Sequence, residues 1–260
     1  MFLFIFIAIA LLIVIVNDAE KKRKPSPPPK SPTKITEPDK HKISPTPLYT
    51  STIAKSGLDM IGLPLSRRRQ IANLADYVVI DTETTGLYPY SDRICEIALI
   101  RVSGGKVVDT FSTLVNPGCS IPAEASAVNG ISDDDVDGAP EYSDIANTVA
   151  SYILGSVVVG HNVTFDLRFV DCLLKECGYT GKCTYIDTLS ISRRMHQNLP
   201  NHKLQTLIEH FGIEQQQAHR GFSDAEATLS LFRIFQAEFD AQLASEAARR
   251  KAAKERKEEN

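Results

Sequence analysis

Apolar and polar positions along residues 57–240 predict strands followed by alternating helices and strands. Five stretches have the apolar content and length of β-strands: 77–80, 93–102, 106–115, 157–159 and 185–186. Amphipathic stretches predict helices at 67–75, 141–154, 164–177, 187–196, 203–211 and 223–240. Strands linked by hairpins, and then alternating helices and strands, predict an α/β fold with a mixed five-stranded sheet flanked by helices.

The first twenty residues differ from this pattern. Residues 2–16 are apolar throughout, and as a helix they would extend about 22–24 Å, less than the roughly 30 Å hydrocarbon core of a bilayer. The basic cluster Lys21–Lys24 follows directly, which by the positive-inside rule places the next segment in the cytoplasm. We therefore expect residues 1–20 to form a single-pass transmembrane anchor in the inner (cytoplasmic) membrane, with the folded domain in the cytoplasm. The alternative is a cleaved secretory signal, although no basic residue precedes the apolar run and no Ala-x-Ala site follows it.

Two further segments have compositions unlike that of a folded domain. Residues 21–56 contain eight of the fourteen prolines, with Lys, Ser and Thr between them, and predict a disordered linker. Residues 241–260 are rich in Ala, Lys, Arg and Glu and predict a charged helical tail. The predicted organisation is an anchor at 1–20, a linker at 21–56, one domain at 57–240 and a tail at 241–260.

Composition limits the partners and the compartment of the protein. The net charge of the 260-residue chain is −3, so a nucleic-acid partner would have to be held by local positive potential or by metal ions. The five cysteines form no Cys-x-x-Cys pair. An odd number of cysteines without a pattern fits a reducing compartment better than a disulfide scaffold.

The candidate chemistry begins at the end of the first predicted strand, with Asp81 and Glu83. Residues two apart on a strand project from the same face. Two buried carboxylates this close would repel each other unless a divalent cation such as magnesium or manganese binds them. For this pair alone, a solvent-exposed strand end is the alternative. Glu96 is a further candidate carboxylate, with a hydrogen-bonded structural role as its alternative.

Two other predicted helices begin with an acidic residue that faces the sheet. Asp166 shares its helix face with apolar residues four and seven positions later. Asp224 follows Ser223, which forms a capping box with Glu226. His219 lies five residues before Asp224, and imidazole is the natural proton acceptor near neutral pH.

The order Asp-x-Glu, Asn-x-x-Phe-Asp and His-x-x-x-x-Asp resembles that of the DEDDh 3′–5′ exonucleases. The chain is most similar to the proofreading (epsilon) subunit of bacterial replicative DNA polymerase and its stand-alone relatives. The resemblance covers about residues 75–240 and includes shorter matching stretches at 81–87, 114–117, 160–162, 186–189 and 199–204. One position departs from the pattern, because Asn129 stands where many relatives have histidine.

The resemblance implies a ribonuclease H-like fold and an enzyme that releases nucleoside 5′-monophosphates from the 3′ end of DNA, or of RNA. It implies a two-metal mechanism, with His219 as the general base and two Mg²⁺ or Mn²⁺ ions held by Asp81, Glu83, Asp166 and Asp224. The residues that it places around the terminal nucleotide are Thr82, Thr84, Leu87, Asn129, His161, Asn162 and Phe165. The expected partners are a nucleic acid with a free 3′ end, single-stranded, and a membrane contacted through residues 2–16, while a polymerase partner is left open.

Three alternatives remain at this stage. A secreted nuclease would follow if residues 1–19 were a cleaved signal. A polymerase proofreading subunit is disfavoured by the short C-terminal tail. A non-catalytic module that binds nucleic-acid ends is disfavoured because all five catalytic positions are present.

Overall fold

The computed structural model of the chain describes residues 57–215 and 220–258. The chain divides into two units, Met1–Thr50 and Ser51–Asn260, and every element described below belongs to the second. The predicted anchor at 1–20, the predicted linker at 21–56 and His219 lie outside the described residues.

Six strands and eight helices form the described part of the chain. The strands are β1 (Leu58–Gly62), β2 (Tyr77–Thr84), β3 (Ile94–Ser103), β4 (Lys106–Leu114), β5 (Val157–Gly160) and β6 (Gly181–Asp187). The helices are α2 (Arg68–Ala72), α3 (Ala123–Asn129), α4 (Asp133–Val136), α5 (Tyr142–Ile153), α6 (Thr164–Glu176), α7 (Thr188–Met195), α8 (Leu204–Phe211) and α9 (Gly221–Glu258). The five predicted strands correspond to β2–β6, and the six predicted helices to α2 and α5–α9.

The six strands form one mixed sheet in the order β1-β6-β5-β2-β3-β4. β2 pairs in parallel with β5 and antiparallel with β3, so it lies in the interior of the sheet. In the antiparallel pair Asp81 lies opposite Ala98 and Glu83 lies opposite Glu96. A register shift follows between Glu83 and Thr84, where the strand ends.

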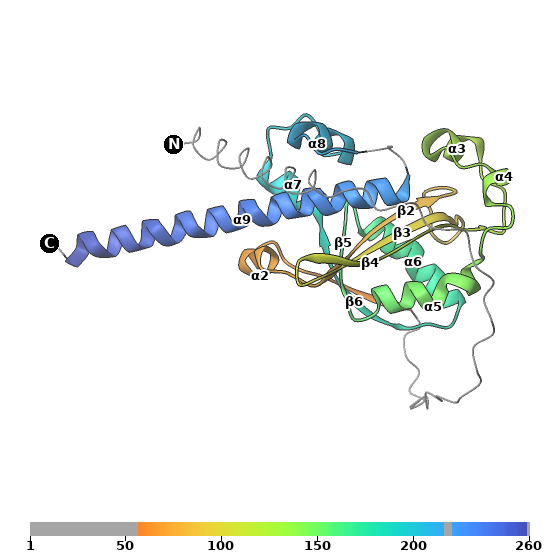
Figure 1. Ribbon diagram of the computed structural model, residues 1–260, viewed down its shortest axis with the longest axis horizontal. Coiled ribbons are helices and arrows are strands. Elements are labelled where there is room, and N and C mark those ends of the chain that lie inside the picture. Colours follow the sequence, from red (N-terminus) through yellow and green to blue (C-terminus); the bar gives the residue numbers. More distant parts are fainter. Residues whose placement is uncertain (1–56, 216–219, 259–260) are drawn as a thin grey trace, which may run out of the picture. The chain divides into compact units, whose positions relative to one another are not determined.

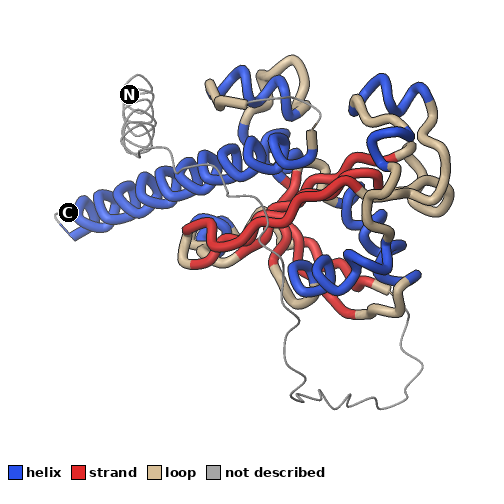
Figure 2. Tube along the Cα trace, turned by 45° about the vertical axis from the view of Figure 1, so that its right-hand side comes forward, coloured by secondary structure: helices blue, strands red, loops and turns tan. Residues whose placement is uncertain are grey.

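Helices cover both faces of the sheet (Figures 1 and 2). Val78 and Ile80 of β2 point into a core that they share with residues of α5 and α6. Tyr77 and Val79 point the other way, into a core formed with α2, α7, α8 and α9. Because side chains alternate along a strand, Asp81 continues the second set and Thr82 the first.

The predicted sheet of five strands is wrong, because β1 adds a sixth strand beside β6. Of the five residues of β1, Leu58 alone is buried, and Ile61 is half exposed. A short strand with one buried side chain has no clear alternation of apolar and polar residues. Its strand state comes from parallel pairing with β6, which sequence periodicity does not show.

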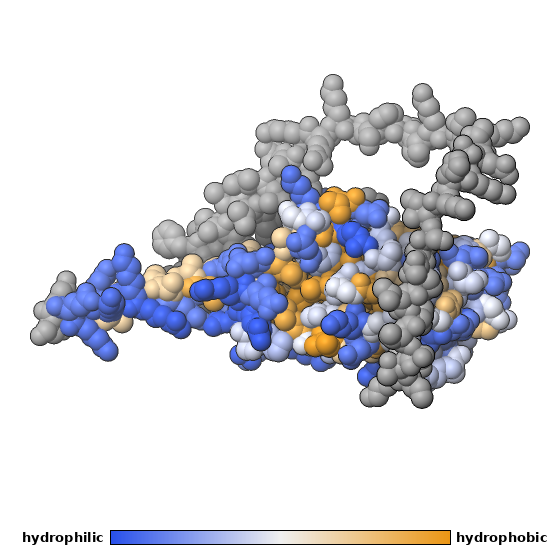
Figure 3. Space-filling view, turned by 90° about the horizontal axis from the view of Figure 1, so that it is seen from below, coloured by the Kyte–Doolittle hydropathy of each residue, from blue (hydrophilic) through white to orange (hydrophobic). Residues whose placement is uncertain are grey.

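Helix α9 runs without a break through both the predicted helix at 223–240 and most of the predicted tail. Its buried residues end at Phe239, and the remaining turns are exposed. In Figure 3 this outer part, at the left, shows mostly hydrophilic residues, whereas hydrophobic residues gather on the body of the domain. The outer part of α9 therefore adds no core to the domain.

The predicted fold class also included an N-terminal membrane helix, and this part of the prediction is corrected. Among residues 57–215 and 220–258, no helix is long and apolar enough to cross a membrane. The predicted single-pass localisation in the inner membrane depended on such a helix and is corrected with it. Residues 2–16, from which both predictions came, lie outside the described part of the chain.

Candidate active site

Three of the predicted carboxylates meet at the end of β2. Asp81 and Glu83 project from the face of the sheet that α9 covers, and Asp224 comes from the first turn of α9. Oxygen atoms of all three carboxylates lie within 4.8 Å of one another. The strand spacing and the start of a helix thus bring three of the four predicted carboxylates together.

Asp166 reaches the same strand from the opposite face, in the first turn of α6. Its Oδ1 atom accepts hydrogen bonds from the Thr82 backbone nitrogen at 3.0 Å and from Thr82 Oγ1 at 2.8 Å. These two bonds hold the Asp166 carboxylate, which is itself buried, against β2. Thr82, a predicted substrate contact, thus has its hydroxyl bonded to an acidic residue of the protein.

Burial and mutual repulsion raise the pKa values of these acids. Burial raises the pKa of Glu83 to about 7, and the negative charge of Asp224 adds to the effect. Burial likewise raises the pKa of Asp166 to about 7, against the hydrogen bonds from Thr82, which lower it. The pKa of Asp81 is raised well above its ordinary value by loss of hydration first and then by the charges of Asp166 and Asp224. A group of acids so disposed binds either protons or a cation.

The donor set fits a divalent cation. Carboxylate oxygens from Asp81, Glu83 and Asp224 converge on one small region, and the oxygen ligands of Mg²⁺ and Mn²⁺ are of this kind. A cation would replace the protons that burial otherwise favours on Asp81 and Glu83. The negative charge of the site and the convergence of its oxygen atoms therefore both fit a bound divalent cation.

Glu96, for which the sequence left two roles open, binds the start of α9. Its carboxylate is buried and accepts from the Gly221 backbone nitrogen at 3.1 Å and from Arg220 Nε at 3.3 Å. Glu96 lies opposite Glu83 in the sheet, so this contact joins β3 to the helix that carries Asp224. The structure therefore gives Glu96 a hydrogen-bonded structural role beside the cluster.

Gln215 also contacts the cluster, and the sequence analysis did not find it. Its side-chain amide donates a hydrogen bond to Asp224 Oδ1. A single glutamine in a loop belongs to no motif and has no periodicity, so no sequence signal marked it. His219, the predicted general base, lies in the segment 216–219 that the structure does not describe.

Several predicted substrate contacts have their polar atoms engaged inside the protein. Asn129 is buried; its amide nitrogen donates to the Thr84 carbonyl oxygen at 3.3 Å, and its oxygen accepts from the Ile131 nitrogen at 3.0 Å. The ring nitrogens of His161 lie 3.0 Å from Thr188 Oγ1 and 2.8 Å from the His202 carbonyl oxygen, and burial lowers the pKa of the imidazole. These side chains support the walls of the site.

Other predicted contacts keep surface that a ligand can reach. Leu87 is 71% exposed in the turn after β2. Asn162 is exposed and has a left-handed backbone (φ 64°), with its nitrogen donating to Asp187 at 2.9 Å. Phe165 is half-buried, with its ring centroid 5.0 Å from that of Phe169. Thr84 is half-buried, and its hydroxyl donates to the Gly86 carbonyl oxygen at 2.6 Å.

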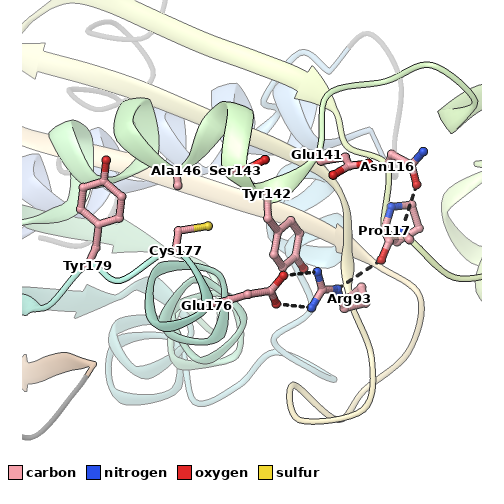
Figure 4. A pocket seen from close by; sticks show the side chains of 11 residues that line it. Arg93, Asn116, Pro117, Glu141, Tyr142, Ser143, Ala146, Glu176, Cys177 and Tyr179 are labelled. Carbon is pink, nitrogen blue, oxygen red and sulfur yellow. Dashed lines mark hydrogen bonds and ion pairs between the residues drawn. The ribbon is translucent and has the colours of Figure 1, made fainter.

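A separate hollow lies between the N-terminus of α5 and the C-terminus of α6 (Figure 4). Arg93 crosses it, paired with Glu176 and bonded to the Pro117 carbonyl oxygen at 3.2 Å, with its guanidinium 3.9 Å from the centre of the Tyr142 ring. None of the predicted site residues that the structure describes lines this hollow. Arg93 and Glu176, which line it, are paired with each other, and we assign this pair a structural role.

Comparison with known proteins agrees with this geometry. Residues 78–232 match the family model described as "Exonuclease", a span that contains all of the carboxylates above. The chain is 37% identical over 172 residues to the PolC-type DNA polymerase III of Caldanaerobacter subterraneus subsp. tengcongensis. That match covers 66% of this chain but 12% of the relative, and the match to the Bacillus subtilis PolC-type enzyme covers 60% and 11%.

Two solved structures share the fold. Exonuclease X, determined in complex with 5′ overhanging duplex DNA, aligns with a TM-score of 0.52 and 26% identity, over 62% of this chain and 92% of that one. Escherichia coli exonuclease I, determined with a dT13 oligonucleotide, aligns with a TM-score of 0.59 and 19% identity, over 66% and 43%. The second likeness, at that identity, concerns the fold alone.

Proposed function

Since the chain belongs to the exonuclease family, as a phosphodiester hydrolase of the DEDDh 3′–5′ type, we propose that it releases nucleoside 5′-monophosphates from the 3′ end of DNA with the help of two metal ions. The observation that carries this proposal is the convergence of Asp81, Glu83 and Asp224 at the end of β2. DNA is the first substrate to test, because relatives at 37% identity are named as DNA polymerases; RNA remains to be compared with it.

Four carboxylates of this chain would hold the ions. Asp81, Glu83 and Asp224 form the converging set, and Asp166 would join it from the other face of β2. When bound, two Mg²⁺ or Mn²⁺ ions supply positive charge that stabilises a phosphate and lowers the pKa of water. Thr82 keeps Asp166 in place, while Glu96 fixes the helix that carries Asp224.

The remaining chemistry falls to side chains around this cluster. His219 would accept the proton of the attacking water, a role that rests on its place five residues before Asp224. Leu87 and Phe165 would contact the terminal base, because Leu87 is exposed in the turn after Glu83 and half-buried Phe165 directly precedes Asp166. Thr84 and Asn162 would contact the sugar and the phosphate of that nucleotide.

Proofreading for a polymerase is the second candidate role. It is favoured by one observation, the 37% identity to a PolC-type polymerase over 172 residues. The matched region is 12% of that relative, so the polymerase activity and the partners of the relative do not follow for this chain. Co-purification of the full-length protein with a replicative polymerase would favour proofreading over a stand-alone exonuclease.

A degradation assay with matched variants tests the proposed function. Full-length protein would be given a uniformly labelled DNA strand, with excess chelator and then with Mg²⁺ or Mn²⁺ restored. We expect mononucleotides only in the presence of metal, no cutting of a circular strand, and a block by a 3′-phosphate. Asp224→Asn should remove most of the activity, whereas Asp240→Asn, exposed on the same helix, should not. Full turnover in excess chelator would refute the metal-dependent mechanism.

A further inference from the structure

Large apolar side chains that are exposed to solvent gather at the end of the β2–β3 hairpin. Seven such residues occur in the described part of the chain, and three of them, Leu87, Tyr88 and Tyr90, lie in the turn after β2. A fourth, Val128, is adjacent to Asn129, whose amide binds the last residue of β2. The other three lie on the edge strands β1 and β4. Exposure of this kind in one place is typical of a binding surface.

The backbone of this turn is held firmly. The Tyr88 nitrogen donates to Asp92 Oδ2 at 2.7 Å, and the Asp92 nitrogen donates to the Tyr88 carbonyl oxygen at 2.7 Å. At the base of the turn, the Arg93 nitrogen donates to Thr85 Oγ1 at 2.9 Å, and the Arg93 side chain is anchored on Glu176 (Figure 4). A ligand that binds the two tyrosines would therefore have little loop motion to suppress.

We propose that Tyr88 and Tyr90 form a stacking platform for the bases of a single-stranded nucleic acid whose 3′ end lies at the carboxylate cluster. The two tyrosines are 71% and 91% exposed, and they follow Glu83 by five and seven residues. An aromatic ring stacks on any base, so the contact would tolerate every sequence. Bases within a duplex already cover one another's faces, so the platform favours an unpaired strand.

This inference rests on the proposed function and adds a preference to it. The carboxylate cluster acts on the terminal phosphodiester, whereas the tyrosines act on the bases before it. Loss of one stacking contact weakens binding about fivefold to a hundredfold. The tyrosines should therefore affect substrate affinity and KM much more than kcat.

Binding without hydrolysis provides the test. Full-length protein in excess chelator would be titrated into a fluorescein-labelled oligo-dT strand, and the Kd read from fluorescence anisotropy. We expect the double change Tyr88→Ala with Tyr90→Ala to raise the Kd about tenfold or more, and the corresponding Phe changes to leave it nearly unchanged. Val108→Ala is the matched control, because Val108 is also exposed (57%) but lies on the edge strand β4.

A second substrate separates stacking from other contacts. An oligonucleotide that carries abasic sites upstream of its terminal nucleotide keeps its phosphates but loses the bases, so wild type and double Ala variant should bind it equally. If wild type and the double Ala variant bind the intact strand equally, the proposal is overturned. The same result is expected if the tyrosines instead bind a protein partner. If wild type degrades DNA while the variants bind it normally, this inference alone fails; if wild type degrades no strand, the proposed function fails.

Discussion

At Glu83, a single carboxyl group takes its properties from three elements of the fold. Its strand places it beside Asp81, α9 places Asp224 against it, and β3 places Glu96 opposite. Burial is the largest cause of its raised pKa, and the neighbouring acids add to it. The proton on this group should therefore be linked to the stability of the whole domain.

We expect the metal-free protein to lose stability as the pH rises from about 4.5 to about 7. Within this window folded Glu83, with a pKa of about 7, still holds a proton that the unfolded chain, with the ordinary value of 4.5, has released. The folded state then binds more protons, so the free energy of unfolding falls with pH. The raised pKa values of Asp166 and Asp81 act in the same direction.

Urea unfolding in excess chelator across this window measures the effect. Glu83→Gln should make the dependence on pH shallower, whereas Glu124→Gln, exposed on α3, should not. Stability that increases across the window would show that the acids are not buried together as described.

The residues of the site divide into those that a sequence can reveal and those that it cannot. The positions of Asp81, Glu83, Asp166 and Asp224 were predictable, because each has a defined place on a strand or at a helix start. Gln215 was not, because its contact with Asp224 depends on a loop that brings it back over the cluster. The burial and the internal hydrogen bonds of Asn129, a predicted substrate contact, were not visible in the sequence either.

At the scale of elements, the site depends on how the start of α9 is tied to β3. The Gly221 nitrogen is one of the backbone donors that a helix leaves unpaired at its start, and the Glu96 carboxylate accepts its hydrogen bond. Asp224 lies three residues further along the same helix. A buried side chain on one strand therefore sets the place of a carboxylate on another element.

Glu96→Ala should lower the free energy of unfolding by about 1–3 kcal/mol, because it leaves the Gly221 donor without its acceptor. Glu96→Gln keeps an acceptor oxygen and should cost less. Urea unfolding at about pH 5 is the suitable measurement, since Glu83, whose pKa is raised to about 7, then holds its proton and its repulsion with Glu96 contributes little. Glu209→Ala, exposed on α8, is the control. An Ala variant as stable as wild type would show that this bond does not hold α9.

Helices and strands were predictable where apolar residues recur regularly along the chain, and less predictable where pairing with another strand determines the structure. β2, β3 and β5 have apolar runs, and α5 and α6 have an apolar stripe that covers the sheet. β1 has one buried residue and becomes a strand by pairing with β6. No local pattern in the sequence describes that pairing.

At the scale of the whole domain, the two ends of α9 contribute differently. Phe232 is fully buried, and its ring meets Tyr77 edge to face at 5.1 Å between centroids. Beyond Phe239 the helix is mostly exposed, with an ion pair between Arg68 and Glu246 at 2.7 Å. The core of the domain therefore uses the first half of the helix.

Deleting residues 248–260 should change the free energy of unfolding by no more than about 0.5 kcal/mol and leave exonuclease activity unchanged. The deletion removes exposed side chains and two surface lysine–glutamate pairs, which contribute little. Phe232→Ala, on the same helix, should by contrast cost about 3–5 kcal/mol. Thermal and urea unfolding of the full-length and shortened proteins measure both. A large loss on deletion would mean that the outer turns support the core.

The place of β2 between β3 and β5 governs how the site can be lost. Edge strands such as β1 and β4 can fray on their own, but an interior strand is released only when the sheet around it comes apart. The amide protons of residues 77–84 should thus be among the last to exchange with heavy water. Heat inactivation and global unfolding should then occur at the same temperature. A protease should therefore cut within β2 only in molecules whose whole domain has unfolded.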